Sequence, residues 1–174
     1  SLATRFAAQW LRLPDLKVMR PDPRYFPYID ESIKDGMRRE TELFFYNIVE
    51  EDRPVTELMT ADYTFMNEGL AKHYGIPGVT GEDFRRVQHT DEERYGLLGQ
   101  ASILTQTSFA RRTSPVNRGK FVMEVLLGTA PPPPPPNVPD LEVTDSVDGA
   151  SGRALTVKER MEMHRQNPTC SACH

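Results

Sequence analysis

Hydrophobic residues recur with helical spacing near the start of the chain. Phe6, Trp10 and Leu13 stand at positions i, i+4 and i+7, which predicts a first helix with one buried face. Pro14 follows directly and is expected to end this helix, because proline lacks the amide that a further turn requires. Prolines are also closely spaced over residues 21–27, so we expect an extended strap there that lies on the core.

The clearest periodicity follows Asp30, a residue type that caps helices well. Four apolar residues share one helical face: Ile33, Met37, Phe44 and Ile48. Charged residues occupy the opposite face: Lys34, Arg38, Arg39 and Glu42. The pattern predicts a long amphipathic helix whose charged face meets solvent.

Shorter elements are expected over the following residues. They are a helix from Asp52-Arg53-Pro54 through Met59, a helix over 64–74 ended by Gly75, a single strand over 84–89, a helix over 97–104, and a helix from the Ser114-Pro115 cap to Gly128. Helices dominate this series. The sequence therefore predicts a mainly α protein with a helical body over residues 1–128.

The character of the sequence changes after this body. Residues 131–136 are six consecutive prolines, which adopt polyproline II with a length of roughly 19 Å. We expect this rod to lie on the body, where aromatic side chains such as Trp10, Tyr25 and Phe26 suit proline rings. With the polar loop that follows it, the proline strap occupies residues 129–153.

Residues 154–174 form the third predicted part. Thr156 and Glu159 have the spacing of a capping box, which begins a helix that continues to about Arg165. Asn167-Pro168 ends it. This small C-terminal helix carries the motif that contains the candidate chemistry of the chain.

Charge and hydropathy exclude several classes of protein. The 174 residues carry a formal net charge of −4, which leaves no basic surplus for nucleic acid. No apolar stretch approaches the roughly 18 residues of a membrane helix, and the first residues lack the features of a secretory signal. We therefore expect a mature chain or a fragment of a larger protein, without a transmembrane segment.

The two cysteines of the chain form one site. Cys170 and Cys173 directly precede His174, and this C-x-x-C-H pattern is the attachment sequence of c-type haem. The two-residue gap matches the separation of the two vinyl groups, to which the thiols add, and the next imidazole reaches the iron. The motif predicts one covalent haem c per chain, with His174 as a metal ligand.

Other functions of these two cysteines, such as zinc binding or dithiol redox chemistry, require residues or elements that the sequence offers only in part. A zinc site requires four ligands, and His164 would be the fourth at an unusual spacing. A thioredoxin-like dithiol requires a helix after the second cysteine, where one residue follows. A local disulfide or two free thiols also remain.

The second axial ligand is a separate question. His164 lies ten residues before His174 on the predicted last helix, and Met161 stands three residues before it on the same face. His164 is therefore a candidate haem-binding residue, and a surface position is its alternative. We expect His73 and His89 to be structural or solvated.

A basic cluster surrounds the Ser114 cap and consists of Arg111, Arg112, Arg118 and Lys120. Guanidinium groups bind carboxylates in a bidentate manner, so the cluster would suit haem propionates or an acidic partner surface. A solvated turn is the alternative. No hydrolytic triad or phosphate loop accompanies it.

Four stretches of the sequence are distinctive: FAAQWLRL, ETELFFYNIVEEDRPVTELMTADYTFMNEGLAKHYGI, RTSPVNRGKFVMEVLLGTAPPPPPPNVP and HRQNPTCSACH. Together they resemble the large planctomycete-type cytochrome-c-like proteins, whose adjacent segments are the domains of unknown function 1592 and 1588. The resemblance implies an exported haem protein with haem c at Cys170, Cys173 and His174. His164 and Arg165 match the His-Arg pair that precedes the motif in that family. Its members carry further domains on both sides, so the resemblance implies a piece of a larger protein.

Three functions are compatible with these observations. The first is electron transfer outside the cytoplasm, with a redox protein or neighbouring subunits as partners. The second is haem-dependent oxidation of an extracellular polymer, and the third is a scaffold module that binds its partners through the proline strap. A six-coordinate iron favours the first and an open position permits the second. Thioether attachment follows export in bacteria, so we expect a periplasmic or cell-surface location.

Overall fold

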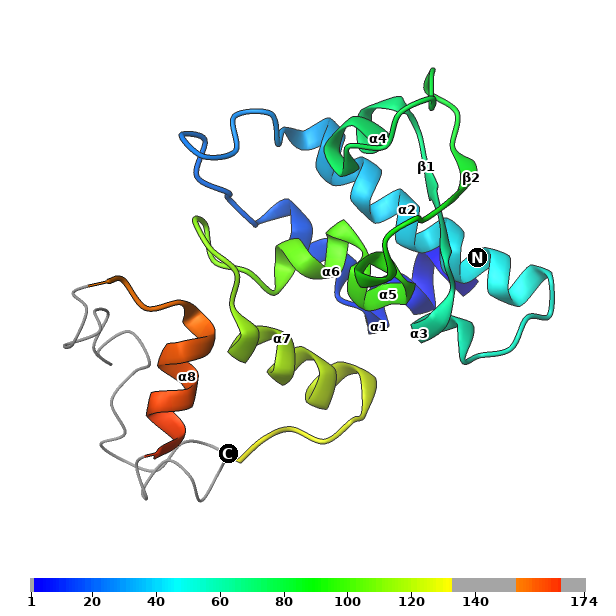
Figure 1. Cartoon of the computed structure of the whole chain (residues 1–174). Helices are drawn as coiled ribbons and strands as arrows, with labels where there is room; N and C mark the ends of the chain where they lie inside the picture. The colour runs from blue at the N-terminus through cyan, green and yellow to red at the C-terminus, as the bar shows by residue number, and fades with distance from the viewer. Residues whose placement is uncertain (1, 133–152, 167–174) are drawn as a thin grey trace. The chain divides into compact units, whose positions relative to one another are not determined.

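Helices make up most of the structure, a computed structural model that describes residues 2–132 and 153–166 (Figure 1). The chain divides into two compact units, Ser1–Pro131 and Pro132–His174. The elements are the π-helical turn η1 (Leu2–Ala7), α1 (Ala8–Trp10), the 3-10 helix η2 (Leu13–Lys17), α2 (Glu31–Glu50), α3 (Glu57–Thr60), β1 (Tyr63–Met66), α4 (Glu68–Tyr74), β2 (Arg85–Gln88), the 3-10 helix η3 (Glu92–Arg94), α5 (Gly96–Gly99), α6 (Ala101–Gln106), α7 (Pro115–Phe121), the π-helical turn η4 (Val122–Leu126) and α8 (Val157–Gln166). The prediction of a mainly α protein is confirmed. The three-part division at residues 128 and 153 stays a prediction.

Helix α2 begins where its capping residue places it. The carboxylate of Asp30 accepts a hydrogen bond from the amide of Ile33 at 2.9 Å. Met37, Phe44 and Ile48 are buried, so the predicted apolar face is confirmed. This face gives the first unit a long central support.

The opposite face of α2 is less exposed than its charges predict. Lys34 is 5% exposed and Glu42 is 3% exposed, so the expectation that both meet solvent is wrong. Lys34 Nζ lies 2.6 Å from a carboxylate oxygen of Glu31, and Glu42 accepts a hydrogen bond from Arg38 at 2.6 Å. Burial of a charge is tolerated when a partner replaces water, and hydrophobic periodicity does not reveal such partners.

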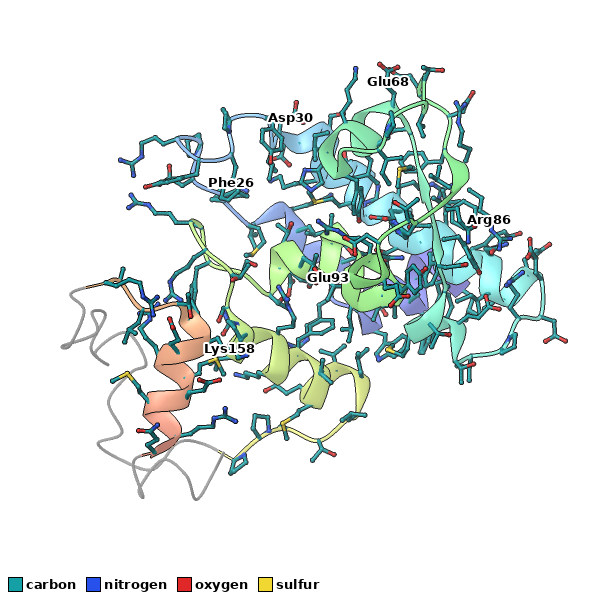
Figure 2. All side chains as sticks on the ribbon, viewed as in Figure 1. Phe26, Asp30, Glu68, Arg86, Glu93 and Lys158 are labelled. Atoms are coloured by element: carbon teal, nitrogen blue, oxygen red, sulfur yellow. The ribbon has the colours of Figure 1, made fainter. Side chains whose placement is uncertain are left out.

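Two strands pair beside α2. β1 and β2 are antiparallel, with Tyr63 opposite Gln88 and Phe65 opposite Arg86. The strand predicted over 84–89 is confirmed, but it is not the single strand that the sequence predicts. Arg86 projects from β2 (Figure 2) and its guanidinium carbon lies 3.7 Å from the centre of the Tyr63 ring.

The helix predicted over residues 64–74 is wrong in its first turn. Thr64 and the two residues after it belong to β1, and helix α4 starts only after Asn67. The side chain of Asn67 accepts a hydrogen bond from the amide of Leu70 at 3.0 Å, which makes Asn67 the cap. Pairing with β2 outweighs the helical spacing here. Gly75 ends α4 in the left-handed region at φ +72°, as predicted.

The first helix is present but shows a different face to the core. Phe6 is 53% exposed, so the predicted Phe6, Trp10 and Leu13 face is wrong at its first member. Small residues allow close packing instead, and the buried positions are Ala3, Ala7, Ala8 and Leu11. Trp10 donates a hydrogen bond from Nε1 to the carbonyl of Val125 at 2.7 Å. The N-terminal segment is thereby fixed to η4.

Pro14 does not end this helix. The chain turns at Arg12, which has φ +56°, and Pro14 then lies in the first turn of η2. Proline is tolerated at such a position because the amides of a first turn need no internal partner. A proline after a helical pattern therefore marks the start of a new turn here.

Three further boundaries differ from the prediction. Asp52 has φ +49°, and α3 starts only at Glu57. The helix over 97–104 is two helices, because Gln100 is extended at ψ 142°. The segment predicted as an extended strap forms turns, and the amide of Tyr25 donates to the carbonyl of Asp22 at 3.0 Å.

The cap before α7 is confirmed. The hydroxyl of Ser114 accepts a hydrogen bond from the amide of Asn117 at 3.2 Å, and Pro115 opens the helix. The helical path continues through η4, and Phe121 and Val125 are buried on it. These two apolar side chains of the helical path therefore face the core.

The described part of the second unit begins with a capping box. The amide of Thr156 donates to Glu159 at 2.7 Å, and the amide of Glu159 donates to the Thr156 hydroxyl at 3.3 Å. Hydrogen bonds from Arg153 and Thr156 hold the pKa of Glu159 near 2. The predicted start of the last helix is confirmed, whereas most of the proline strap lies outside the described residues. Within the described ranges, no helix is long and apolar enough to cross a membrane.

One hydrophobic cluster joins both ends of the first unit. It contains residues of η1 and α2, and also Leu97, Ile103, Phe121 and Val125. A second cluster lies between α2 and α4 and includes Met37, which the sequence places in the core. Residues far apart in the chain therefore share one core.

Gly99 allows the backbone of α5 to lie close to the backbone of Arg94. A Cβ at Gly99 would overlap the backbone of Arg94, whereas a Cβ at the exposed helical Gly119 would meet no atom within 4 Å. We expect Gly99→Ala to lower the free energy of unfolding by about 2 kcal/mol or more, as overpacked sites do. Gly119→Ala is the control and should leave stability equal or higher by up to about 1 kcal/mol. Urea denaturation measures both, and equal stability of the two variants would contradict the described contact.

Candidate functional site

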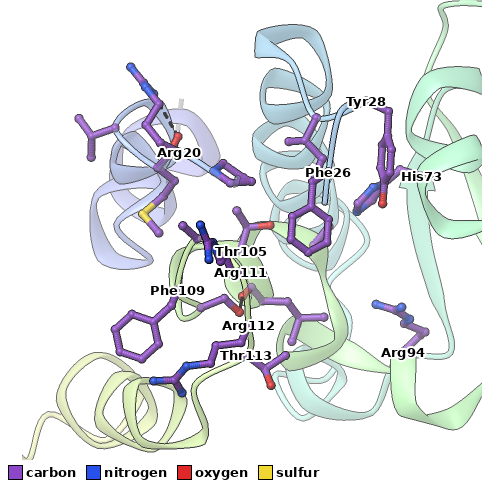
Figure 3. Close-up of a pocket in the computed structure, with 18 residues that line it drawn as sticks. Arg20, Phe26, Tyr28, His73, Arg94, Thr105, Phe109, Arg111, Arg112 and Thr113 are labelled. Atoms are coloured by element: carbon purple, nitrogen blue, oxygen red, sulfur yellow. Dashed lines mark hydrogen bonds between the residues drawn. The ribbon is translucent and has the colours of Figure 1, made fainter. Parts of the chain in front are cut away.

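A cavity of about 610 Å³ lies in the first unit (Figure 3). Its walls come from residues 18–29, from His73 at the end of α4, from Arg94 at the end of η3 and from residues 101–113. The apolar lining residues include Val18, Met19, Phe26, Ile29, Leu104 and Phe109. The basic lining residues are Arg20, Arg94, Arg111 and Arg112, and none of the lining residues is acidic. The cavity therefore combines an apolar interior with positive charge.

Two of these arginines have partners that hold them at the wall. Arg111 donates from Nε to Asp22 at 2.7 Å, and its guanidinium carbon lies 5.7 Å from the Tyr25 ring. Hydrogen bonds from Arg24 and then Arg111 hold the pKa of Asp22 well below its usual range. Arg20 donates to the carbonyl of Met19 at 3.0 Å. Both side chains are fixed by neighbours in sequence or space.

Arg94 stands in a different environment. Its guanidinium carbon lies 5.3 Å from the centre of the Tyr74 ring. Among the residues that the structure describes, no carboxylate lies within ion-pair distance of Arg94. Burial, followed by the charge of Arg94, lowers the pKa of His73 and of His89, and the same charge opposes the larger effect of burial on the pKa of Glu40. Arg94 is thus a cation at the cavity without an ion-pair partner in the described chain.

His73 contributes an uncharged polar group to the same wall. Burial, followed by the charge of Arg94, lowers the pKa of His73, so the imidazole is neutral at pH 7. Its Nδ1 is buried and has no hydrogen-bond partner in the described part of the chain. The ring centre of His73 lies 5.9 Å from that of Tyr28 and 5.7 Å from that of Tyr74.

A buried carboxyl group lies next to this wall. Glu40 of α2 is fully buried and accepts hydrogen bonds from the hydroxyl of Thr64 at 2.7 Å and of Tyr74 at 2.8 Å. The Tyr74 oxygen in turn accepts the amide of Ala101, a cavity residue, at 2.7 Å. The network connects α2, β1, α4 and α6.

Burial decides the charge of this group. It raises the pKa of Glu40 to about 7, although the hydrogen bonds from Thr64 and Tyr74 and the charge of Arg94 oppose this rise. Burial also raises the pKa of Tyr74. Near neutral pH a large fraction of Glu40 is therefore protonated, and its negative charge neutralises Arg94 only in part.

The sequence contains an indication that Glu40 is buried, although hydrophobic periodicity considers only the apolar residues of this helix. Glu40 lies three residues after Met37 and four before Phe44, so it shares the predicted core face of α2. A carboxylate in such a stripe is rarely buried without partners. Its partners come from β1 and α4, which the sequence does not place beside α2.

The predicted haem residues stand apart from these observations. Cys170, Cys173 and His174 lie outside the described residues, and α8 includes His164, whose side chain is also outside them. Within the described ranges, no group of three His, Cys, Asp or Glu side chains could hold a metal ion. The haem site therefore stays a prediction.

The other predicted residues are distributed between the cavity and its surroundings. Arg111 and Arg112 line the cavity, whereas Arg118 and Lys120 do not, so the predicted basic cluster is only partly brought together there. His73 lines it as well. His89 is 6% exposed, and its ring centre lies 6.0 Å from that of Tyr74.

These features define a mainly helical protein with a basic, apolar cavity beside a buried carboxyl group. Residues 1–76 match a family described as PSD4, a protein of unknown function (DUF1592), and residues 94–174 match one described as PSCyt3, a protein of unknown function (DUF1588). The chain carries this adjacent pair of domains, which is the domain pair of the planctomycete cytochrome-c-like proteins, and the resemblance is confirmed. No curated protein and no solved structure matches it.

The cavity uses residues of both matched segments. Phe26 and His73 belong to the first segment, and Arg94 and Phe109 belong to the second. The Glu40 network crosses the same boundary through the hydrogen bond between Tyr74 and Ala101. In the first unit the two family segments therefore build one site together.

The raised pKa of Glu40 predicts a pH-dependent stability. Between the usual carboxyl pKa of 4.5 and the folded value of about 7, the folded chain binds more protons than the unfolded chain. The free energy of unfolding therefore falls as pH rises through this window, by on the order of 3 kcal/mol in total. Glu40→Gln should remove this contribution, while Glu50→Gln, at the exposed end of the same helix, should keep it. Urea denaturation from pH 4 to 8 tests this, and parallel profiles for wild type and Glu40→Gln would contradict it.

Proposed function

We propose that this chain is part of a c-type cytochrome that transfers electrons outside the cytoplasm. The observation that carries the proposal is the C-x-x-C-H motif at Cys170, Cys173 and His174, within the segment that matches the second family. These are the only cysteines of the chain, so no other thiol competes for attachment. One haem c per chain would be bound.

The donor set fits the group. Two thiols at a two-residue gap suit two vinyl groups, and an adjacent imidazole suits an axial position. Haem, when bound, supplies one-electron chemistry. Cys170 and Cys173 would hold it and His174 would orient it, while His164 on α8 is the candidate for the second axial position.

The expected location follows from this chemistry. Thioether attachment occurs after export in bacteria, so the parent protein would act in the periplasm or at the cell surface. A redox protein or neighbouring subunits of a larger assembly would be its partners. Net charge −4 speaks against nucleic acid as a partner.

The second candidate function is haem-dependent oxidation, which would require a site for a substrate. An electron carrier needs no ligand pocket, whereas the first unit contains a cavity of about 610 Å³ with charged and apolar walls. This volume lies in the usual range of small-molecule sites, roughly 300–1,000 Å³. A five-coordinate, high-spin iron in the native protein would favour oxidation, and a six-coordinate, low-spin iron would favour the carrier.

Covalent attachment is tested on the denatured chain from a host that matures cytochromes c. We expect its mass to exceed that of the polypeptide by one haem, and a pyridine haemochrome spectrum to show two thioether bonds. Cys170→Ser combined with Cys173→Ser should abolish the covalent mass, whereas Ser171→Ala, between the two cysteines, should retain it. A wild-type chain with the bare polypeptide mass would refute the proposal.

A further inference from the structure

We propose that the cavity between residues 18–29 and residues 101–113 binds a small aromatic carboxylate, with Arg94 as the partner of the carboxylate group. No haem is needed for this binding, so the inference is independent of the proposed function. It rests on two observations within the first unit: the shape and apolar lining of the cavity, and the charge of Arg94, which has no ion-pair partner among the described residues.

The lining favours a flat apolar body. Phe26 and Tyr28 lie on one side of the cavity and Phe109 on the other (Figure 3). Aromatic rings in a wall favour a stacked or edge-on aromatic ligand. The guanidinium carbon of Arg112 lies 4.6 Å from the Phe109 ring, so it adds a planar cationic surface to that side.

The charge of the lining favours a single anion. The lining contains four arginines and no carboxylate, and Arg111 is held by Asp22 at 2.7 Å. Arg94, in contrast, contacts the Tyr74 ring and has no ion-pair partner among the described residues. A guanidinium group binds a carboxylate through two parallel hydrogen bonds. A guanidinium without an ion-pair partner beside aromatic walls suits a carboxylate on a ring.

Two groups near Arg94 leave its positive charge largely uncompensated. Glu40 is protonated to a large extent near neutral pH, so it neutralises Arg94 only in part. His73 is neutral, and its Nδ1 has no partner in the described chain. Buried polar groups without partners are uncommon and require an explanation.

The test compares two ligands that differ in charge. Isothermal titration calorimetry of the full chain is carried out with 2-naphthoate and with 2-naphthamide, its uncharged amide. We expect 2-naphthoate to bind at least tenfold more tightly. Arg94→Gln should remove most of this difference by weakening 2-naphthoate about tenfold and leaving 2-naphthamide unchanged.

Two further variants separate the contributions of charge and apolar wall. Phe26→Ala should weaken both ligands by a similar factor, because it removes apolar contact only. Arg39→Gln is the matched control, since Arg39 lies on α2 outside the cavity lining and pairs with Glu42 at 3.4 Å. It should leave both affinities unchanged. Thermal melting of each variant verifies that it folds.

Several results would overturn the inference. They are equal affinity of the wild type for the two ligands, no binding of either, loss of 2-naphthoate binding in Arg39→Gln, and displacement of 2-naphthoate by an equal concentration of inorganic phosphate. Haem content is measured on the same samples by pyridine haemochrome. Failure of ligand binding in a haem-loaded chain would therefore leave the proposed cytochrome function standing. Ligand binding by a chain without haem would leave the ligand site standing and would contradict the cytochrome function.

Discussion

The hydrogen bonds around the buried carboxyl group of Glu40 connect four elements of the first unit. They come from Thr64 on β1 and Tyr74 on α4, and the Tyr74 oxygen also accepts the amide of Ala101 at the start of α6. A buried carboxyl group without these partners would be costly, so the four elements are constrained to meet at one place. Because the network fixes α4 and α6, it also fixes two walls of the cavity.

The same network explains why two family segments form one structural unit. Tyr74 belongs to the first segment and Ala101 to the second, and Trp10 reaches Val125 in the same way at 2.7 Å. Side chains of both segments fill one hydrophobic cluster. The boundary between the matched segments therefore does not separate two folded bodies in residues 2–131.

Local chemistry was readable from the sequence, and tertiary pairing was not. The caps at Asp30, Ser114 and Thr156 were predicted because each depends on residues within one helical turn. The segment that begins at Tyr63 is a strand because it pairs with β2. The sequence does not reveal this pairing, because β2 lies some twenty residues further along the chain. The sequence shows Glu40 as a carboxylate on an apolar helix face. The cavity, in contrast, is lined by separate segments between residues 18 and 113, and no periodicity in the sequence connects them. The haem motif is the converse case, since five adjacent residues predict its chemistry without any tertiary information.

Glu40 is the buried carboxyl group at the centre of this network, and burial leaves it partly protonated near neutral pH. Its side-chain carboxyl carbon can be followed by ¹³C NMR from pH 4 to 9 in the glutamate-labelled full chain, with Glu40→Gln to assign the signal. We predict a titration midpoint near pH 7, because burial raises the pKa of Glu40 to about 7. A midpoint near 4.5, as in an exposed glutamate, would show that the group is solvated and would contradict the account.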